Sequence, residues 1–303
     1  MTSAATSVGL SAPGERLPAA PPGRRHRRKV GWLGRIVCYL LLAALSVSFL
    51  FPILWSMTAS VKPLKEVYKF PPEIWVSDPQ WSNYPEALRK LPFLAFMLNT
   101  VVIVTAATTG QVLSSSLVGY AFARLRFRGR GLWFIVLLAT MMLPGQVLLI
   151  PHFLTYKYLG WVNTYKPLIL PHWLGGGAFF IFLFRQFFKG IPRELEEAAR
   201  IDGASDFQIY WRIFLPNAKP VLATVAVMSF IAHWKEFMGP LIYLSDFEKY
   251  PISLGLHMYN SLEGSWVNLL MAASIVALGP LVLIFFFAQR YFVRGILLTG
   301  TKG

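Results

Sequence analysis

Two neighbouring charged residues stand within a long apolar segment of this 303-residue chain and are its first candidates for chemistry. Lys235 and Glu236 interrupt the apolar run 220–244. Charged side chains inside a membrane-spanning segment usually face a cavity or pair with one another, so both are candidates for a solute pathway. Lys235 has a second interpretation, because a long lysine side chain near the outer end of a span can extend to the membrane surface.

The rest of the sequence offers few groups arranged for catalysis or metal binding. Its five histidines show no ligand-like spacing, and its single cysteine, Cys38, stands in an apolar run, which indicates a packing role. No paired carboxylates and no Ser/His/Asp set stand at suggestive spacing, and no Gly-x-x-x-x-Gly-Lys-Ser/Thr loop is present to bind ATP phosphates. We therefore expect no catalytic residue, no metal site and no cofactor in this chain.

The composition is typical of a protein that crosses a membrane several times. Hydrophobic residues make up 55% of the chain and charged residues 14%, against about 25% charged in a soluble domain. A helix needs about 20 apolar residues to cross the hydrocarbon. The candidate spans are 36–57, 91–123, 131–156, 167–184, 220–244 and 264–289. We expect an all-α polytopic membrane protein with six transmembrane helices.

The distribution of Lys and Arg predicts how these spans are oriented. With both termini inside, the inner segments hold 20 of the 29 Lys and Arg residues and the outer segments hold eight, which follows the positive-inside rule. This orientation places 185–219 in the cytoplasm and 58–90 outside. Residues 1–30 are rich in small residues and proline and end in a basic run, which predicts a disordered basic cytoplasmic tail. Aromatic and basic residues do not interleave as on a nucleic-acid surface, so the net charge of +15 does not indicate nucleic acid.

The polar insert between the fourth and fifth apolar segments predicts two short helices joined by a tight turn. The first covers 191–203, with Pro192 at its first position and Gly203 as a left-handed end. Ser205 and Gln208 have the spacing of a capping box that begins the second helix, which we expect to stop near Pro216. Such an insert is either an amphipathic link along the membrane surface or a rigid peg that docks on a partner. The small side chains Ala198 and Ala199 favour the peg.

The insert also resembles a known motif: Glu-Ala-Ala, three residues, Gly, nine residues, Ile, one residue, Leu-Pro. The motif belongs to the permease subunits of bacterial and archaeal binding-protein-dependent ABC importers. It matches Glu197, Ala198, Ala199, Gly203, Ile213, Leu215 and Pro216. Further similarity at 119–124, 141–144, 183–188 and 294–303 is closest to the sugar-importer branch, of the maltose and glycerol-3-phosphate type, and to the second permease of the pair. The resemblance covers roughly residues 90–303.

This resemblance implies a type I ABC importer permease fold and a chain that is not itself an enzyme. The implied partners are two ABC ATPase subunits that bind ATP and Mg, a second permease subunit in a heterodimer, an external solute-binding protein and the lipid bilayer of a bacterial or archaeal plasma membrane. The implied regions are the tail 1–30, the first transmembrane helix with an extracytoplasmic loop at 31–90, and the permease core 91–303. Within the core, the coupling loop 189–219 is expected to dock on the ATPase. The expected coupling residues are Glu197, Ala198, Ala199, Asp202, Gly203, Ile213, Leu215 and Pro216.

The branch resemblance further implies a carbohydrate or a sugar derivative as the solute. The candidates for its path are Trp234, Lys235 and Glu236; Trp234 is either a surface that stacks on a sugar ring or a packed aromatic. Relatives more often carry Asn at the position of Lys235, so this chain departs from the family there. An importer for a non-sugar solute, an ion-coupled secondary carrier, a channel and a membrane-embedded enzyme are the alternatives. The ion-coupled carrier would usually bury several acidic or histidine side chains in its spans.

Overall fold

The structure, a computed structural model, describes residues 32–261 and 264–300, with side chains as far as residue 289 except at 261 and 264. The predicted basic tail 1–30 lies outside the described residues. The chain divides into two compact units, residues 1–51 and 52–303. Helix α1 (Trp32–Ser60) begins in the first unit and ends in the second.

Almost every regular element of the described chain is a helix, as predicted. The long helices of the second unit are α4 (Phe93–Arg124), α5 (Arg130–Thr140), α6 (Leu149–Tyr158), α7 (Lys166–Gly175), α8 (Ala178–Lys189), α12 (Lys219–Trp234) and α15 (Val267–Gly300). The short elements are α2 (Leu64–Val67), α3 (Asn83–Lys90), η1 (Gly145–Leu148), α9 (Glu194–Ile201), α10 (Asp206–Ile209), η2 (Tyr210–Phe214), α11 (Leu215–Asn217), α13 (Met238–Tyr243), η3 (Phe247–Lys249) and α14 (Ile252–His257). Strands β1 (Asn260–Ser261) and β2 (Gly264–Ser265) form a two-residue antiparallel ladder that the all-α prediction did not include.

The number of spans agrees with the sequence only when bent helix pairs are counted. Four helical segments of the described chain are long and apolar enough to cross a membrane, and two bent pairs raise the number to six. The four are Trp32–Ser60, Phe93–Arg124, Lys166–Lys189 and Val267–Gln289. The predicted third span, 131–156, is not one straight helix, because the chain bends by 92° between Thr140 and Gly145. Pro144 lies in this break, where a proline cannot continue a helix.

The predicted fifth span, 220–244, is also divided. Helix α12 ends at Trp234, and the chain resumes as α13 only at Met238. Lys235 and Glu236 therefore lie in a break between two helices. At its other end, α12 meets the segment 206–217 at an angle of 80°. The two charged residues thus mark the end of a helix, which the apolar pattern alone did not reveal.

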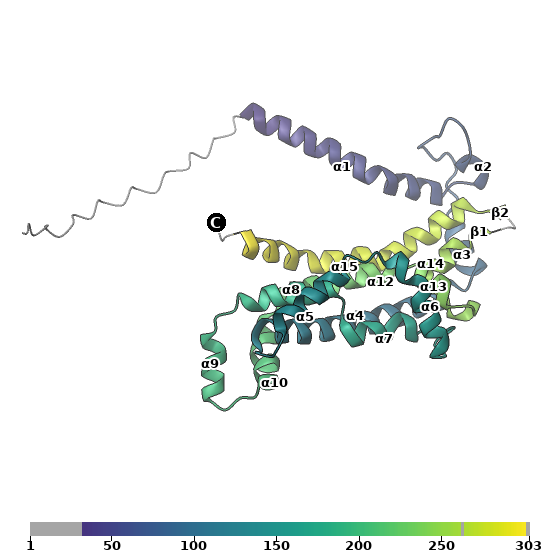
Figure 1. Ribbon diagram of the computed structural model, residues 1–303. Coiled ribbons are helices and arrows are strands. Elements are labelled where there is room, and N and C mark those ends of the chain that lie inside the picture. Colours follow the sequence, from purple (N-terminus) through teal and green to yellow (C-terminus); the bar gives the residue numbers. More distant parts are fainter. Residues whose placement is uncertain (1–31, 262–263, 301–303) are drawn as a thin grey trace, which may run out of the picture. The chain divides into compact units, whose positions relative to one another are not determined.

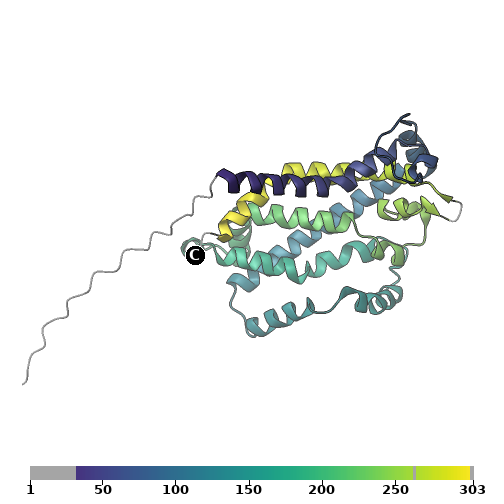
Figure 2. The same cartoon turned by 90° about the horizontal axis from the view of Figure 1, so that it is seen from above.

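Helix α4 is the element around which the second unit is packed, with α7, α8 and α12 in contact along its length. Small residues allow this close approach: a Cβ on Gly110 would lie 2.2 Å from the Trp173 ring. Gly176 has φ +59° and its missing Cβ would lie 2.6 Å from Ser115 N, so the break between α7 and α8 sits directly on α4. Figure 2 shows α5 and α6 at the edge of this bundle, on the side away from α15.

Candidate functional site

Two regions of the second unit hold the candidate residues, and they lie at opposite ends of the helices. The insert with α9 and α10 projects from one end of the bundle, and α13 and α14 lie at the other end (Figure 1). The insert contains all the predicted coupling residues, and the far end contains the predicted path residues. The insert is built from local backbone signals that the sequence carries.

The insert folds as the two predicted helices, with one difference at its start. Helix α9 begins at Glu194, two residues after Pro192, so Pro192 precedes the helix instead of opening it. Gly203 has φ +79°, and its N–H donates to Arg200 O at 3.1 Å, which confirms the left-handed end. Ser205 Oγ accepts from Gln208 N at 3.3 Å, and Ser205 N donates to Gln208 Oε1 at 2.8 Å. The capping box is therefore confirmed.

The predicted coupling residues separate into an exposed set and an inward set. Those exposed are Glu197, Ala198, Asp202, Gly203 and Pro216. The half-buried ones are Ala199, Ile213 and Leu215, which pack against an aromatic cluster beneath the insert. Ala198 and Ala199 are therefore not one surface patch, because only Ala198 is exposed.

The aromatic cluster joins the insert to the transmembrane helices. Tyr120 of α4 lies with its ring centroid 5.0 Å from that of Phe214 and 5.3 Å from that of Tyr210. Ser116 Oγ is 2.8 Å from the Tyr210 hydroxyl, and Phe188 packs edge-on against Phe214 at 5.7 Å. These side chains come from α4, from α8 and from η2 in the second helix of the insert. The cluster therefore packs the insert directly against the ends of α4 and α8.

A buried arginine adds a polar connection that the sequence did not predict. Arg124, the last residue of α4, donates from Nε and Nη2 to Phe188 O at 3.2 and 2.6 Å, and from Nη2 also to Ile191 O. Its Nη1 lies 3.7 Å from Glu196 Oε2 in α9. In the sequence, Arg124 stands as a basic residue at the end of an apolar run. The positive-inside rule accounts for such a residue, so its contacts with the insert were not predicted.

The exposed face of the insert is more apolar than its charged sequence indicated. The exposed apolar side chains are Leu195, Ile201, Phe207 and Trp211, and Ile201 keeps 86% of its surface accessible. Exposed apolar side chains that gather on a small projecting element are typical of a surface that another protein covers. The exposed face of the insert thus includes apolar residues outside the matched motif.

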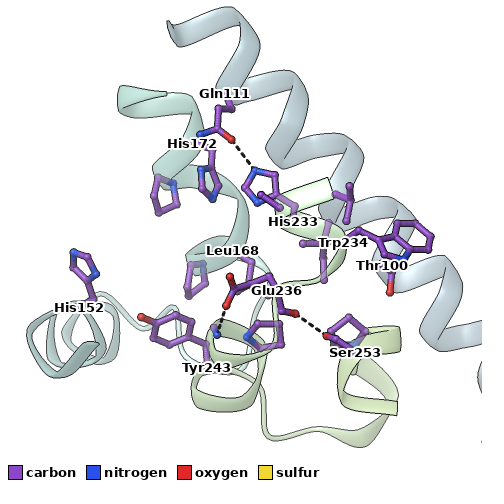
Figure 3. A pocket seen from close by; sticks show the side chains of 18 of the residues that line it. Thr100, Gln111, His152, Leu168, His172, His233, Trp234, Glu236, Tyr243 and Ser253 are labelled. Carbon is purple, nitrogen blue, oxygen red and sulfur yellow. Dashed lines mark hydrogen bonds between the residues drawn. The ribbon is translucent and has the colours of Figure 1, made fainter. Parts of the chain in front are cut away.

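At the far end of the bundle, a cavity of about 430 Å³ opens between α4, α6, α7, α12 and α13. This volume lies in the range of small-molecule sites, about 300–1,000 Å³. Two of the three predicted path residues, Trp234 and Glu236, line the cavity, whereas Lys235 is exposed and is not among the described lining residues. Figure 3 shows side chains from these elements converging on it.

Trp234 and Glu236 occupy different environments within the lining. Trp234 is 4% exposed, donates from Nε1 to Ala277 O at 3.2 Å and stacks on Phe230 at 5.3 Å, so most of the ring packs into the interior. Glu236 is exposed, and its Oε1 accepts from Gly239 N at 2.9 Å, a bond that caps the start of α13. Glu236 O accepts from Ser253 Oγ at 2.7 Å, which ties the break to α14.

A polar network on one wall of the cavity was not anticipated from the sequence. Gln111 of α4 accepts at Oε1 from Ser229 Oγ at 2.6 Å, and the same oxygen lies 2.9 Å from His233 Nε2 (Figure 3). Gln111 Nε2 donates to Gly176 O at 3.1 Å, in the break between α7 and α8. The His172 and His233 rings lie 4.3 Å apart. The histidines stand 61 positions apart, so their spacing carried no signal.

The comparisons with known proteins agree with this architecture. Residues 115–298 match the family described as "Binding-protein-dependent transport system inner membrane component". The chain belongs to that family. Proteins of this family are permeases of ABC importers, which are transporters and not enzymes. Membership in this inner-membrane family, with several helices able to span a membrane, makes the chain a membrane permease of an importer and does not favour the ion-coupled carrier.

Two curated relatives and one solved structure are similar over most of the permease. The arabinooligosaccharides transport system permease AraQ of Bacillus subtilis strain 168 is 32% identical over 273 residues, which cover 89% of this chain and 96% of AraQ. The sn-glycerol-3-phosphate transport system permease UgpE of Yersinia pestis strain Antiqua is 34% identical over 270 residues, 86% of this chain and 95% of UgpE. A chain of a bacterial ABC transporter that imports the acidic polysaccharide alginate superimposes with a TM-score of 0.75 at 26% identity, covering 90% of this permease and all of that chain.

Proposed function

We propose that this permease forms half of the transmembrane pathway of an ATP-driven importer for a carbohydrate or a sugar derivative. An external solute-binding protein delivers the solute, two separate ATPase subunits bind ATP and Mg, and a different second permease completes the pathway. The complex lies in a bacterial or archaeal plasma membrane with both termini of this chain in the cytoplasm. The names of AraQ, UgpE and the alginate transporter support the carbohydrate assignment.

One observation carries this proposal: the insert is a projecting, internally capped pair of helices fixed to the ends of α4 and α8. Its exposed motif residues, among them Glu197, Ala198 and Gly203, are available to a partner. The aromatic cluster and Arg124 beneath it resist independent movement of the insert. A force applied to α9 is therefore transmitted to the transmembrane helices instead of bending a flexible link.

In the proposed cycle, closure of the two ATPases on ATP draws the inserts of the two permeases together. The movement of α9 displaces α8 through Arg124 and displaces α12 through η2 and α11, which directly precede it. Because α12 carries the wall of the cavity at its far end, this displacement opens or closes the cavity. Hydrolysis and release of the products return the inserts to their separated position.

The orientation and the docking are tested by a single cysteine on the insert. Cys38 is the only cysteine of the chain, so Cys38→Ala with Ala198→Cys gives one defined label site. A membrane-impermeant thiol reagent should modify this cysteine in inside-out vesicles but not in intact cells, and the ATPase should protect it and co-purify with the permease. Modification in intact cells would contradict the orientation. Equal modification with and without the ATPase would contradict the docking.

A further inference from the structure

The cavity lining has an unequal charge distribution. Among the described residues that line it, Glu236 is the only one with a carboxylate, and none is Lys or Arg. The remaining polar lining consists of hydroxyl, amide and imidazole groups, such as those of Tyr156, Gln111 and His172. Such groups donate to and accept from sugar hydroxyls without requiring a charge on the solute.

Glu236 is held at the wall of the cavity by two hydrogen bonds. Its Oε1 is fixed by Gly239 N, and its own carbonyl is fixed by Ser253 Oγ (Figure 3). No ion pair in the described part of the chain includes Glu236, and the neighbouring Lys235 side chain is exposed outside the lining. A fixed carboxylate in a partly enclosed cavity repels anions, and the described lining holds no Lys or Arg to offset it.

We propose that Glu236 is a specificity-determining residue that makes the cavity selective for neutral polyhydroxylated carbohydrates and excludes phosphorylated and uronic sugars. This inference rests on the proposed function, since it names which sugars pass. Among the chemical classes named for the similar proteins, it favours uncharged oligosaccharides over glycerol phosphate and over acidic polysaccharides. Exclusion by a like charge is an established route to discrimination between solutes of similar size.

The potential in the cavity is measurable without knowing the solute. Ala232 is exposed and lines the cavity, so Ala232→Cys in a Cys38→Ala background places one thiol there. In the purified full complex, the thiol is treated with a cationic, an anionic and a neutral methanethiosulfonate, and both charged rates are divided by the neutral rate. The cationic reagent should react about tenfold faster than the anionic one, the ratio expected when a single nearby carboxylate acts on both reagents through partly screened solvent.

The same ratio in two variants identifies its source. Glu236→Gln should bring the ratio close to one, whereas Glu248→Gln should leave it unchanged, because Glu248 is exposed and does not line the cavity. Equal rates for both charged reagents in the parent protein, or a ratio that Glu236→Gln does not alter, would overturn the proposal. Failure of the neutral reagent to react would show that solutes cannot enter the cavity and would overturn it as well.

Protection of the same cysteine by sugars tests the solute class. Arabinotriose should slow the neutral reagent by threefold or more, and glycerol 3-phosphate and trigalacturonate should not, unless Glu236 is replaced by Gln. Equal protection by the anionic sugars in the parent protein would overturn the charge selectivity and leave the importer assignment intact. Absence of protection by every sugar, with the charge ratio preserved, would instead overturn the carbohydrate assignment of the proposed function.

Discussion

Arg124 and Glu196 form, at 3.7 Å, the only ion pair in the described part of the chain whose two side chains are both largely buried, with 5% and 13% of their surfaces exposed. Arg124 belongs to α4, the helix around which the second unit is packed, and Glu196 to the projecting helix α9. The same guanidinium lies over the Phe214 ring, with its central carbon 4.9 Å from the ring centroid. One side chain thus joins α4 to three parts of the insert region.

Replacing Arg124 should uncouple the insert from the membrane helices. Arg124→Met removes the guanidinium that donates to two backbone carbonyls and pairs with Glu196, and hydrogen bonds to a charged group contribute about 1.5–3 kcal/mol each. We expect ATP-driven uptake in proteoliposomes to fall by about tenfold or more, while the complex still assembles. Hydrogen exchange over residues 190–204 should become faster. Arg124→Lys should lose nearly as much, because an ammonium cannot reach all these acceptors at once.

Arg200 provides the matched control for this prediction, because it also pairs with Glu196. Its side chain is 45% exposed, and its hydrogen bonds to Glu196 and Asp206 raise the pKa of the guanidinium, so it stays charged. Exposed pairs contribute about 0–1 kcal/mol. Arg200→Gln should therefore leave uptake within about twofold of the parent protein. A loss as large as that of Arg124→Met would show that pairing of Glu196 with either arginine supports uptake, and that the burial of the Arg124 contact is not what matters.

The exposed surface of α9 around Ala198 should tolerate small side chains and reject large ones. Ala198 is exposed and the neighbouring Ala199 is half-buried, so a change at Ala198 affects the proposed docking surface without disturbing the aromatic cluster. Ala198→Trp should abolish co-purification with the ATPase while leaving the amount of permease in the membrane unchanged, and Ala198→Ser should retain both. Ala199→Trp is a poorer test, since it would also disrupt packing. Normal docking of Ala198→Trp would exclude this face as the contact.

The turn after α9 should distinguish substitutions by backbone geometry. Gly203 has φ +79°, and its N–H donates to Arg200 O. Gly203→Pro is incompatible with both features, because proline fixes φ near −65° and has no N–H, and we expect it to unfold the turn and stop transport. Gly203→Ala has open space for its Cβ and should lower the stability of the insert by only about 1 kcal/mol. Hydrogen exchange at 199–205 measures both effects.

The insert was largely predictable because its signals are local. A capping box and a left-handed glycine act within a few residues, so Ser205 and Gly203 could be placed from the sequence and were confirmed. The helix breaks were harder to predict. Apolar residues continue on both sides of Pro144 and of Lys235, and membrane helices tolerate proline, so composition predicted a continuous span where the helix is broken.

The cavity wall could not be predicted, because its residues come from distant parts of the chain. Gln111 and His233 are 122 positions apart and meet only because α4 packs against α12. Each stands among other polar residues of a largely apolar helix, a pattern that equally fits a residue with a satisfied local hydrogen bond. Glu236 was identifiable as a charge within an apolar run. That Glu236 lines the cavity while Lys235 does not depends on the end of α12 at Trp234, which the sequence did not reveal.

Gln111 should be the most sensitive polar residue of the membrane region, since one side chain joins three elements. It is 7% exposed, and Gln111→Leu would leave Ser229, His233 and Gly176 O without this partner. Hydrogen bonds between membrane helices contribute about 0.6 kcal/mol on average and up to about 1.7, so three of them should total about 2 kcal/mol.

We therefore expect Gln111→Leu to lower the thermal stability of the purified complex and to reduce uptake, because the break between α7 and α8 is no longer held to α12. Gln146→Leu is the matched control, as Gln146 is exposed in η1 and should be neutral. A double-mutant cycle with Ser229→Ala should give a coupling energy of at least about 0.5 kcal/mol, as expected for residues in direct contact. Additive effects in that cycle, or equal stability of the two Gln→Leu variants, would show that the network contributes nothing to the packing of the three helices.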